Sequence, residues 1–149
     1  MIRVVIDTNA LINAADDDFS FPHRILDEVL AGSIEAYANS ATLRENRMIV
    51  SGMIRDPGYL DKLQKYFERV RTVESSQRLS VVEDPEDNKI LESAIAASAQ
   101  FLITSDQHLL KLNPYESIAI VTPAEFWNRL EDEEGRGWQN WIKQFISSV

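Results

Sequence analysis

Two short apolar runs in the chain each end in an aspartate. Residues 2–6 are followed by Asp7, and residues 101–105 are followed by Asp106. If both runs are strands of one parallel sheet, their carboxyl ends meet at one edge, which is where open α/β sheets bind ligands. Carboxylates that meet repel each other unless a proton or a cation is taken up. The pair therefore predicts an acidic pocket for a divalent cation, with oxygen ligands that suit Mg²⁺ or Mn²⁺.

Two further carboxylates are candidates for the same pocket. Glu45 lies one turn into a helix that Ser40 is expected to cap, and Asp87 lies at the start of another helix. Each alone also suits a structural role, because acidic side chains in a first helical turn stabilise the helix dipole. If all four converge, a bound metal would neutralise a phosphate, activate a water and stabilise the leaving oxygen. The constellation predicts phosphodiester hydrolysis, with Asp7, Glu45, Asp87 and Asp106 as catalytic metal ligands.

Polar neighbours of these carboxylates are expected to support the site. The candidates for hydrogen bonding to the ligands or to a phosphate are Asn9, Asp84, Asn88, Thr104 and Ser105. The chain has no cysteine and two histidines, His23 and His108. A metal site with thiolate ligands is therefore excluded, and two histidines offer little for a histidine metal site or for acid–base catalysis. His108 is close to Asp106 in sequence, but we expect it to be an exposed loop residue.

The rest of the chain alternates between strand and helix patterns. Strands are predicted at residues 2–6, 34–38, 101–104 and 118–121, which are short and mostly rich in Val, Ile or aromatic residues. Between them, apolar residues recur at helical spacing. Strands that alternate with helices predict an α/β fold, in which a parallel sheet carries helices on both faces.

Local signals predict where several helices begin and end. Phe21-Pro22 opens a helix that Gly32 is expected to stop, and Thr122-Pro123 opens a later one. Asp56-Pro57-Gly58 is expected to form a turn before a helix over residues 60–70.

The length of the chain predicts one domain with a full core. We expect this domain at residues 1–130 and a helical extension at 131–149, packed on the same domain. The extension would place Trp138, Trp141 and Phe145 on one face. The alternative is that this face contacts a partner or a second copy.

Charge is unevenly distributed along the chain. The net charge is −9, but the segment from Arg44 to Arg78 carries eight Lys or Arg and five Asp or Glu, so it is +3. This segment is expected to bind an RNA backbone through Arg44, Arg47, Arg69 or Arg71. The alternative is a solvated helical face. The chain shows no secretory leader and no apolar run near the roughly 20 residues of a membrane span, so we expect a cytoplasmic protein.

Five motifs resemble those of the PIN-domain nucleases (PilT N-terminus-like), in the order of that family. They are residues 5–12 (VIDTNALI), 40–45 (SATLRE), 84–91 (DPEDNKIL), 102–110 (LITSDQHLL) and 121–126 (VTPAEF). The third is similar to the form found in the branch of toxin components of toxin–antitoxin pairs. The resemblance covers residues 2 to about 130.

The resemblance implies a three-layer α/β/α sandwich with a central parallel sheet. It also implies a divalent-metal-dependent ribonuclease that uses Mg²⁺ or Mn²⁺, frequently forms a homodimer and is in many cases neutralised by a small antitoxin protein. Carried over by position, Asp7, Glu45, Asp87 and Asp106 form its acidic site, with Asn9 beside them. We expect the substrate to be single-stranded RNA.

Two other functional classes share parts of this pattern. A phosphatase or phosphotransfer domain also uses a strand-terminal aspartate and a metal, but the haloacid-dehalogenase type needs a second aspartate where Asn9 stands. A response-regulator receiver needs an acidic pair and a late strand-terminal lysine, and neither arrangement is found. A non-catalytic module for nucleic acid or protein interaction on the same fold remains open. Metal-dependent cleavage of a labelled RNA would separate it from an enzyme.

Overall fold

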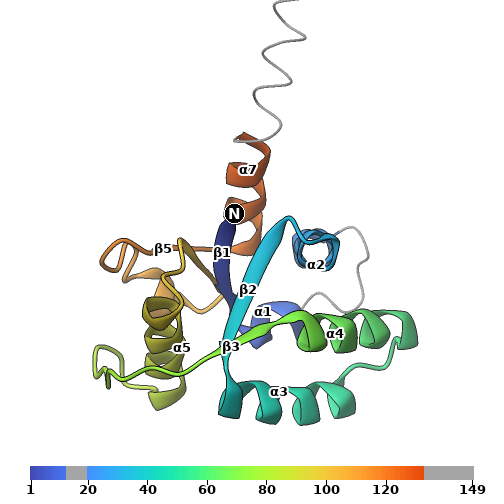
Figure 1. Ribbon diagram of the computed structural model, residues 1–149, viewed down its shortest axis with the longest axis horizontal. Coiled ribbons are helices and arrows are strands. Elements are labelled where there is room, and N and C mark those ends of the chain that lie inside the picture. Colours follow the sequence, from blue (N-terminus) through green and yellow to red (C-terminus); the bar gives the residue numbers. More distant parts are fainter. Residues whose placement is uncertain (13–19, 133–149) are drawn as a thin grey trace, which may run out of the picture.

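The computed structural model describes residues 1–12 and 20–132. Its centre is a parallel sheet of five short strands (Figure 1), in the order β3-β2-β1-β4-β5. The strands are β1 (Ile2–Ile6), β2 (Ile34–Asn39), β3 (Arg71–Val73), β4 (Phe101–Ile103) and β5 (Ala119–Val121). The chain builds outward from β1 through β2 to β3, then returns to the other side of β1 for β4 and β5. The strand order therefore reverses between β1 and β4, which is where sheets of this kind open a ligand crevice.

Seven helices accompany these strands in the described residues. They are α1 (Thr8–Ile12), α2 (Phe21–Ala31), α3 (Ser40–Met53), α4 (Pro57–Arg69), α5 (Pro85–Ala96), α6 (Gln107–Leu110) and α7 (Pro123–Leu130). None of them is long and apolar enough to cross a membrane.

Two apolar cores lie on opposite faces of the sheet. Val4 and Ile6 of β1 join the larger core, together with residues of α2, α3, α4 and α7, whereas Val5 joins the smaller core with residues of α5. This alternation follows from the period of two in a strand, which points successive side chains to opposite faces. The two cores confirm the expected three-layer α/β/α fold with a parallel sheet.

The main strand and helix predictions are confirmed, with local corrections. β3 was not predicted, because it has three residues and no apolar run, and it pairs only with β2 at the sheet edge. The cap of α3 is Asn39 and not Ser40, since the Asn39 Oδ1 accepts from the N–H groups of Ala41 and Thr42. The expected turn at 56–58 is the start of α4, capped by Asp56.

Two short helices that were not predicted, α1 and α6, begin directly after Asp7 and Asp106. The neighbouring helices fix α1 in place. The Asn46 Nδ2 of α3 donates to the Thr8 Oγ1 at 2.6 Å, and the buried Tyr59 hydroxyl of α4 donates to the Leu11 carbonyl. His23 is a core residue whose ring packs against that of Tyr59 at 4.2 Å. α1 therefore has little freedom to move away from the end of β1.

The division of the chain at residue 130 stays a prediction, and α7 ends at Leu130. The extension over 131–149 and its aromatic face fall almost entirely outside the described residues. Its packing remains a prediction.

Candidate functional site

Asp7 is buried at the carboxyl edge of the sheet, with 6% of its surface exposed. Its N–H donates to the Ile103 carbonyl at 2.8 Å, so the β1–β4 ladder continues one residue to carry it. Its Oδ2 accepts from the Thr104 hydroxyl at 2.8 Å, and its Oδ1 accepts from the Asn9 N–H at 3.2 Å. Burial raises the pKa of Asp7, while these two hydrogen bonds act in the opposite direction.

Thr104 joins the two strand-terminal aspartates. Its buried hydroxyl donates to Asp7 and also accepts from the Asp106 N–H at 3.0 Å. Asp106 caps α6, and its Oδ1 accepts from the His108 N–H at 2.8 Å. Three residues that follow β1 and β4 therefore form one hydrogen-bonded unit, in which both carboxylates have a fixed position.

Asp87 approaches the same edge from the first turn of α5. Its pKa is raised to about 6, first by burial, then by the charge of Asp106 and a hydrogen bond with it, and by the charges of Asp84 and Asp7. Asp84, Asp87 and Asp106 line a cleft of about 580 Å³. We call this the acidic cleft. The structure therefore brings Asp7, Asp87 and Asp106 together, and adds Asp84 to them.

Glu45 lies elsewhere on the same edge of the sheet. It is exposed on α3, and the neighbour on which its charge acts is Lys89 of α5. The charge of Glu45 is not among the causes of the raised pKa of Asp7 or of Asp87. Its role as a metal ligand therefore stays a prediction based on its motif.

The residues expected to support the site take different positions. Thr104 contacts both aspartates as expected, whereas Ser105 is exposed. Asp84 caps α5 by accepting from the Glu86 N–H at 2.9 Å. Asn9 contributes its backbone N–H to Asp7.

The Asn88 side chain binds the loop before α5 and not a carboxylate. Its Oδ1 accepts from the Val81 and Val82 N–H groups, and its Nδ2 donates to the Val82 and Asp84 carbonyls. Asn88 therefore holds the backbone that carries Asp84.

The four candidate arginines are not on one surface. Arg44 and Arg47 are exposed on α3, near the carboxyl edge of the sheet, and have no ion pair with any described residue. Arg69 and Arg71 line a pocket with Met1 and Ile34 at the amino edge of the sheet. The Arg71 Nη2 lies 3.6 Å from the Glu35 Oε1. We therefore leave Arg69 and Arg71 out of the proposed RNA path.

Lys89 was not among the candidates, although it is close to the site. It lies two residues after Asp87, and it lines a small crevice with Asp7 and Thr42. Its ammonium is 3.0 Å from the Glu86 Oε1. Its position in the sequence could have indicated this, because Lys89 follows Asp87 by two residues at the start of the same helix.

The donor chemistry of the site fits a divalent cation. Among the described residues, no three acidic or histidine side chains lie close enough to hold one ion as they stand. However, Asp7 and Asp87 both have raised pKa values, and the negative charge of Asp106 contributes to both increases. A hard cation would remove this repulsion, and carboxylate oxygens are the ligands that Mg²⁺ and Mn²⁺ prefer. Asp7, Asp87 and Asp106 are the residues that would hold it.

Comparison with known proteins supports a nuclease-type fold. A family model described as PIN domain matches residues 3–108, which includes both strand-terminal aspartates. The uncharacterized protein MJ1680 of Methanocaldococcus jannaschii is 29% identical over 144 residues, which is 87% of this chain and 92% of that protein. No solved structure matches the chain significantly.

Removal of the Thr104 hydroxyl should destabilise the protein. In Thr104→Val the shape is retained, but Asp7 loses a donor and the Asp106 N–H loses an acceptor. We expect a cost of about 1–3 kcal/mol in the free energy of unfolding at neutral pH, measured by denaturant titration. Thr104→Ser, which keeps the hydroxyl, is the matched control and should lose much less. A loss in Thr104→Val that is no larger than the loss in Thr104→Ser would contradict the role assigned to the hydroxyl.

The raised pKa of Asp87 predicts a pH-dependent effect on stability in the metal-free protein. The folded state binds this proton more tightly than the unfolded chain, so the carboxylate lowers stability as pH rises from its ordinary pKa of 3.8 through about 6. Asp87→Asn should therefore raise the melting temperature at neutral pH and have little effect below the ordinary aspartate range. Glu86→Gln, in the same helical turn but exposed, is the control and should give no such gain. A loss of stability at neutral pH in Asp87→Asn would contradict this account.

Proposed function

Since this chain belongs to the PIN-domain family, a family of metal-dependent nucleases, we propose that it is a ribonuclease that hydrolyses phosphodiester bonds in single-stranded RNA. The observation that carries the proposal is the unit of Asp7, Thr104 and Asp106, which Asp87 joins across the acidic cleft. A non-catalytic module has no need to bury carboxylates that repel each other.

In this proposal the carboxylates have two different roles, metal binding and proton acceptance. Asp7 and Asp106, which have fixed positions, would hold Mg²⁺ or Mn²⁺ together with Asp87, and Glu45 would be the fourth ligand by its motif. A bound cation would supply charge neutralisation at the phosphate and a lowered pKa for the attacking water. Asp84, exposed at the rim of the cleft, can accept a proton from the attacking water.

The substrate path follows from the positive charges near the acidic edge. Lys89 lines the crevice beside Asp7, and Arg44 and Arg47 are exposed on the neighbouring helix α3. These cations can neutralise backbone phosphates on both sides of the reacting one. They support an RNA substrate despite the net charge of −9. A phosphotransfer domain is less well supported, because Asn9 replaces its second aspartate.

The biological role we propose is that of the toxin in a cytoplasmic toxin–antitoxin pair. The support is the resemblance of residues 84–91 to that branch of the family. A small upstream gene with a DNA-binding motif, whose product binds this protein and inhibits cleavage, would support the role.

The central prediction concerns Asp7. Asp7→Asn keeps the shape and one of the two acceptor oxygens but removes the charge, so it should abolish Mg²⁺- or Mn²⁺-dependent cleavage of a labelled single-stranded RNA. Asp61→Asn, an exposed carboxylate of α4 paired with Lys65, is the control and should cleave at the normal rate. Full cleavage by Asp7→Asn, or by the wild type in excess chelator, would refute the mechanism.

We also propose a homodimer, and among the described residues α3 provides a better surface for it than α4. The apolar side chains of α4, including Leu63, Tyr66 and Phe67, are buried in the core and leave no surplus surface. On α3, by contrast, Met48, Ile49 and Met53 are exposed. All three lie in the last two turns of one helix, and apolar side chains that gather on a surface mark interaction sites.

A second copy that packs on Met48, Ile49 and Met53, in the last two turns of α3, would bury these side chains, so a charged residue placed there should prevent dimer formation. The double variant Met48→Lys, Met53→Lys should therefore be monomeric under conditions in which the wild type is a dimer, as measured by light scattering across a concentration series. Val81→Lys, at an exposed apolar residue away from α3, is the control and should remain dimeric. A wild-type protein that remains monomeric at concentrations of tens of micromolar would contradict the proposed dimer.

A further inference from the structure

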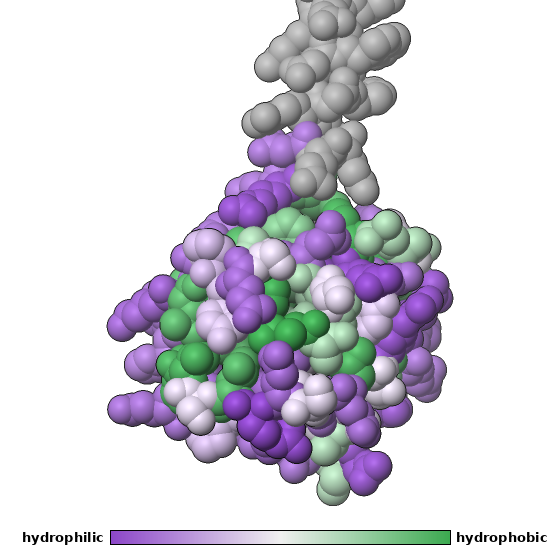
Figure 2. Space-filling model, turned by 60° about the vertical axis from the view of Figure 1, so that its left-hand side comes forward, coloured by the Kyte–Doolittle hydropathy of each residue, from purple (hydrophilic) through white to green (hydrophobic). Residues whose placement is uncertain are grey.

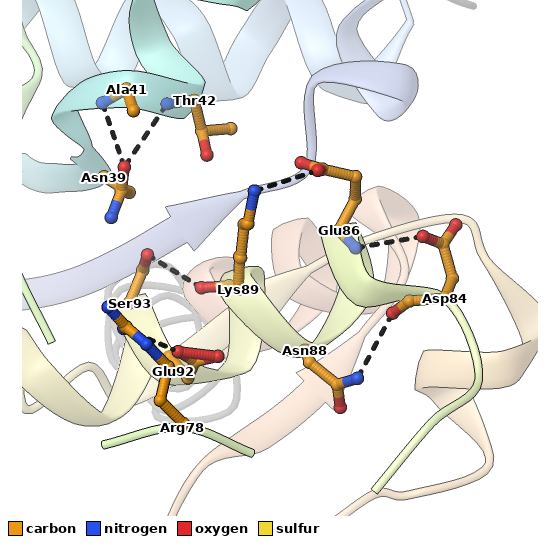
Figure 3. Close-up of polar contacts among 10 residues, drawn as sticks. All are labelled: Asn39, Ala41, Thr42, Arg78, Asp84, Glu86, Asn88, Lys89, Glu92 and Ser93. Atoms are coloured by element: carbon orange, nitrogen blue, oxygen red, sulfur yellow. Dashed lines mark hydrogen bonds and ion pairs between the residues drawn. The ribbon is translucent and has the colours of Figure 1, made fainter. Parts of the chain in front are cut away.

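A second cleft, larger than the acidic one, lies between α3 and α5. It has a volume of about 630 Å³. Its lining includes Asn39 and Ala41 at the start of α3, Arg78 and Leu79 of the loop between β3 and α5, and Lys89 and Glu92 of α5. Figure 3 shows these residues except Leu79. We call it the α3–α5 groove. Its volume is in the usual range for sites that bind small ligands. Of its lining residues, only Lys89 has a part in the proposed hydrolysis, as a contact to the RNA backbone.

Glu92 provides a buried acceptor in this groove. Its side chain is 7% exposed, and its Oε1 lies 3.4 Å from the Arg78 Nη1. No described residue donates a hydrogen bond to the Oε2 of Glu92. That oxygen is not among the described side-chain atoms that are fully buried without a partner, so it is open to solvent in the groove. The groove therefore contains a fixed carboxylate with acceptor capacity left over.

Lys89 connects this groove to the acidic residues. It lines the α3–α5 groove and also the small crevice that contains Asp7. Figure 3 shows Lys89 and Glu92 on successive turns of α5, with the Lys89 ammonium directed toward the Glu86 carboxylate. A phosphate bound at Lys89 would lie beside Asp7. The base attached to that nucleotide would then be within reach of Glu92.

The groove also offers apolar surface for the faces of a base. Leu79, Val82 and Pro85 contribute to its lining. The side of the molecule that carries α5 shows hydrophobic surface between hydrophilic residues (Figure 2). Single-stranded RNA is usually recognised in this way, with the base packed on its faces and hydrogen-bonded along its Watson–Crick edge.

We propose that the α3–α5 groove binds the nucleobase next to the scissile phosphate and that Glu92 selects guanine. This inference rests on the proposed ribonuclease function. Guanine has two adjacent N–H donors on its Watson–Crick edge, which match the two oxygens of one carboxylate, and its O6 can accept from Arg78. Cytosine and adenine offer one amino group, and uracil offers one N–H between two carbonyls that a carboxylate repels.

The competing explanation is that Glu92 only holds Arg78 and its loop. Arg78 is 84% exposed at its side chain, and ion pairs with an exposed partner contribute little to stability. A purely structural pair would not distinguish one base from another. Base preference is therefore the measurement that separates the two explanations.

The first experiment measures binding of the four nucleoside 5′-monophosphates by calorimetry, without RNA cleavage. The wild type should bind GMP at least roughly tenfold more tightly than AMP, CMP or UMP, as one good bidentate contact allows. Glu92→Gln replaces one acceptor by a donor at constant shape and should remove this preference. Glu83→Gln, an exposed carboxylate in the lining of the same groove, is the matched control and should keep it. Equal binding of all four nucleotides by the wild type, or an unchanged preference in Glu92→Gln, overturns the proposal.

Arg78→Gln provides a second variant at an exposed position, where folding is not at risk. It should weaken GMP binding several-fold and leave UMP binding unchanged. Unchanged GMP binding would count against the assigned role of Arg78 and overturn the two-residue recognition proposed here.

Cleavage of an RNA that contains all sixteen dinucleotide steps distinguishes this proposal from the ribonuclease function. Faster cleavage at steps with guanine, lost in Glu92→Gln with other steps unchanged, supports both. Cleavage without base preference keeps the ribonuclease and removes the guanine site. Binding of GMP that depends on Glu92, in a protein that cleaves no RNA, keeps the guanine site and removes the ribonuclease.

Discussion

The burial of one negative charge at the point where the strand order reverses is the constraint on which the rest of the structure depends. Asp7 directly follows β1 and is buried, so few water molecules can bind its carboxylate. Hydrogen-bond donors of the protein must therefore replace them. The Thr104 hydroxyl and the Asn9 N–H are these donors. Both donors exist only because β4 lies beside β1 and α1 begins directly after Asp7. The topology of the sheet and the chemistry of its edge are therefore linked through a single side chain.

Most of the fold could be predicted from the sequence, because its central strands are apolar and its helices carry regular patterns. The pattern of β1 and β4 also predicted that Asp7 and Asp106 would share an edge, and the structure places both there. β3 could not be found in this way, since an exposed edge strand of three residues is defined by its pairing with β2 and not by its own side chains. Its sequence, Arg71-Thr72-Val73, has no alternating apolar pattern.

The arrangement of charge was harder to predict than the fold. A count of basic residues along the chain treats Arg44 and Arg71 alike, but α3 lies after the carboxyl end of β2 whereas Arg71 begins β3 and is close to Glu35. Several other cations of the same segment have carboxylate neighbours, such as Lys62 with Asp27 and Lys65 with Asp61. Proximity in sequence gives no information on these partners. The same limit applies to the α3–α5 groove, whose walls come from segments about 50 residues apart.

The loop held by Asn88 separates two spaces. Val82 and Glu83 line both the acidic cleft and the α3–α5 groove, and the Asn88 amide binds this stretch at the Val81 and Val82 N–H groups and the Val82 carbonyl. The two cavities thus share a thin partition attached to α5 through one side chain. Because this stretch is shared, a displacement of it toward one cavity would narrow that cavity and widen the other. This mechanical link needs no conformational change beyond a few residues of backbone.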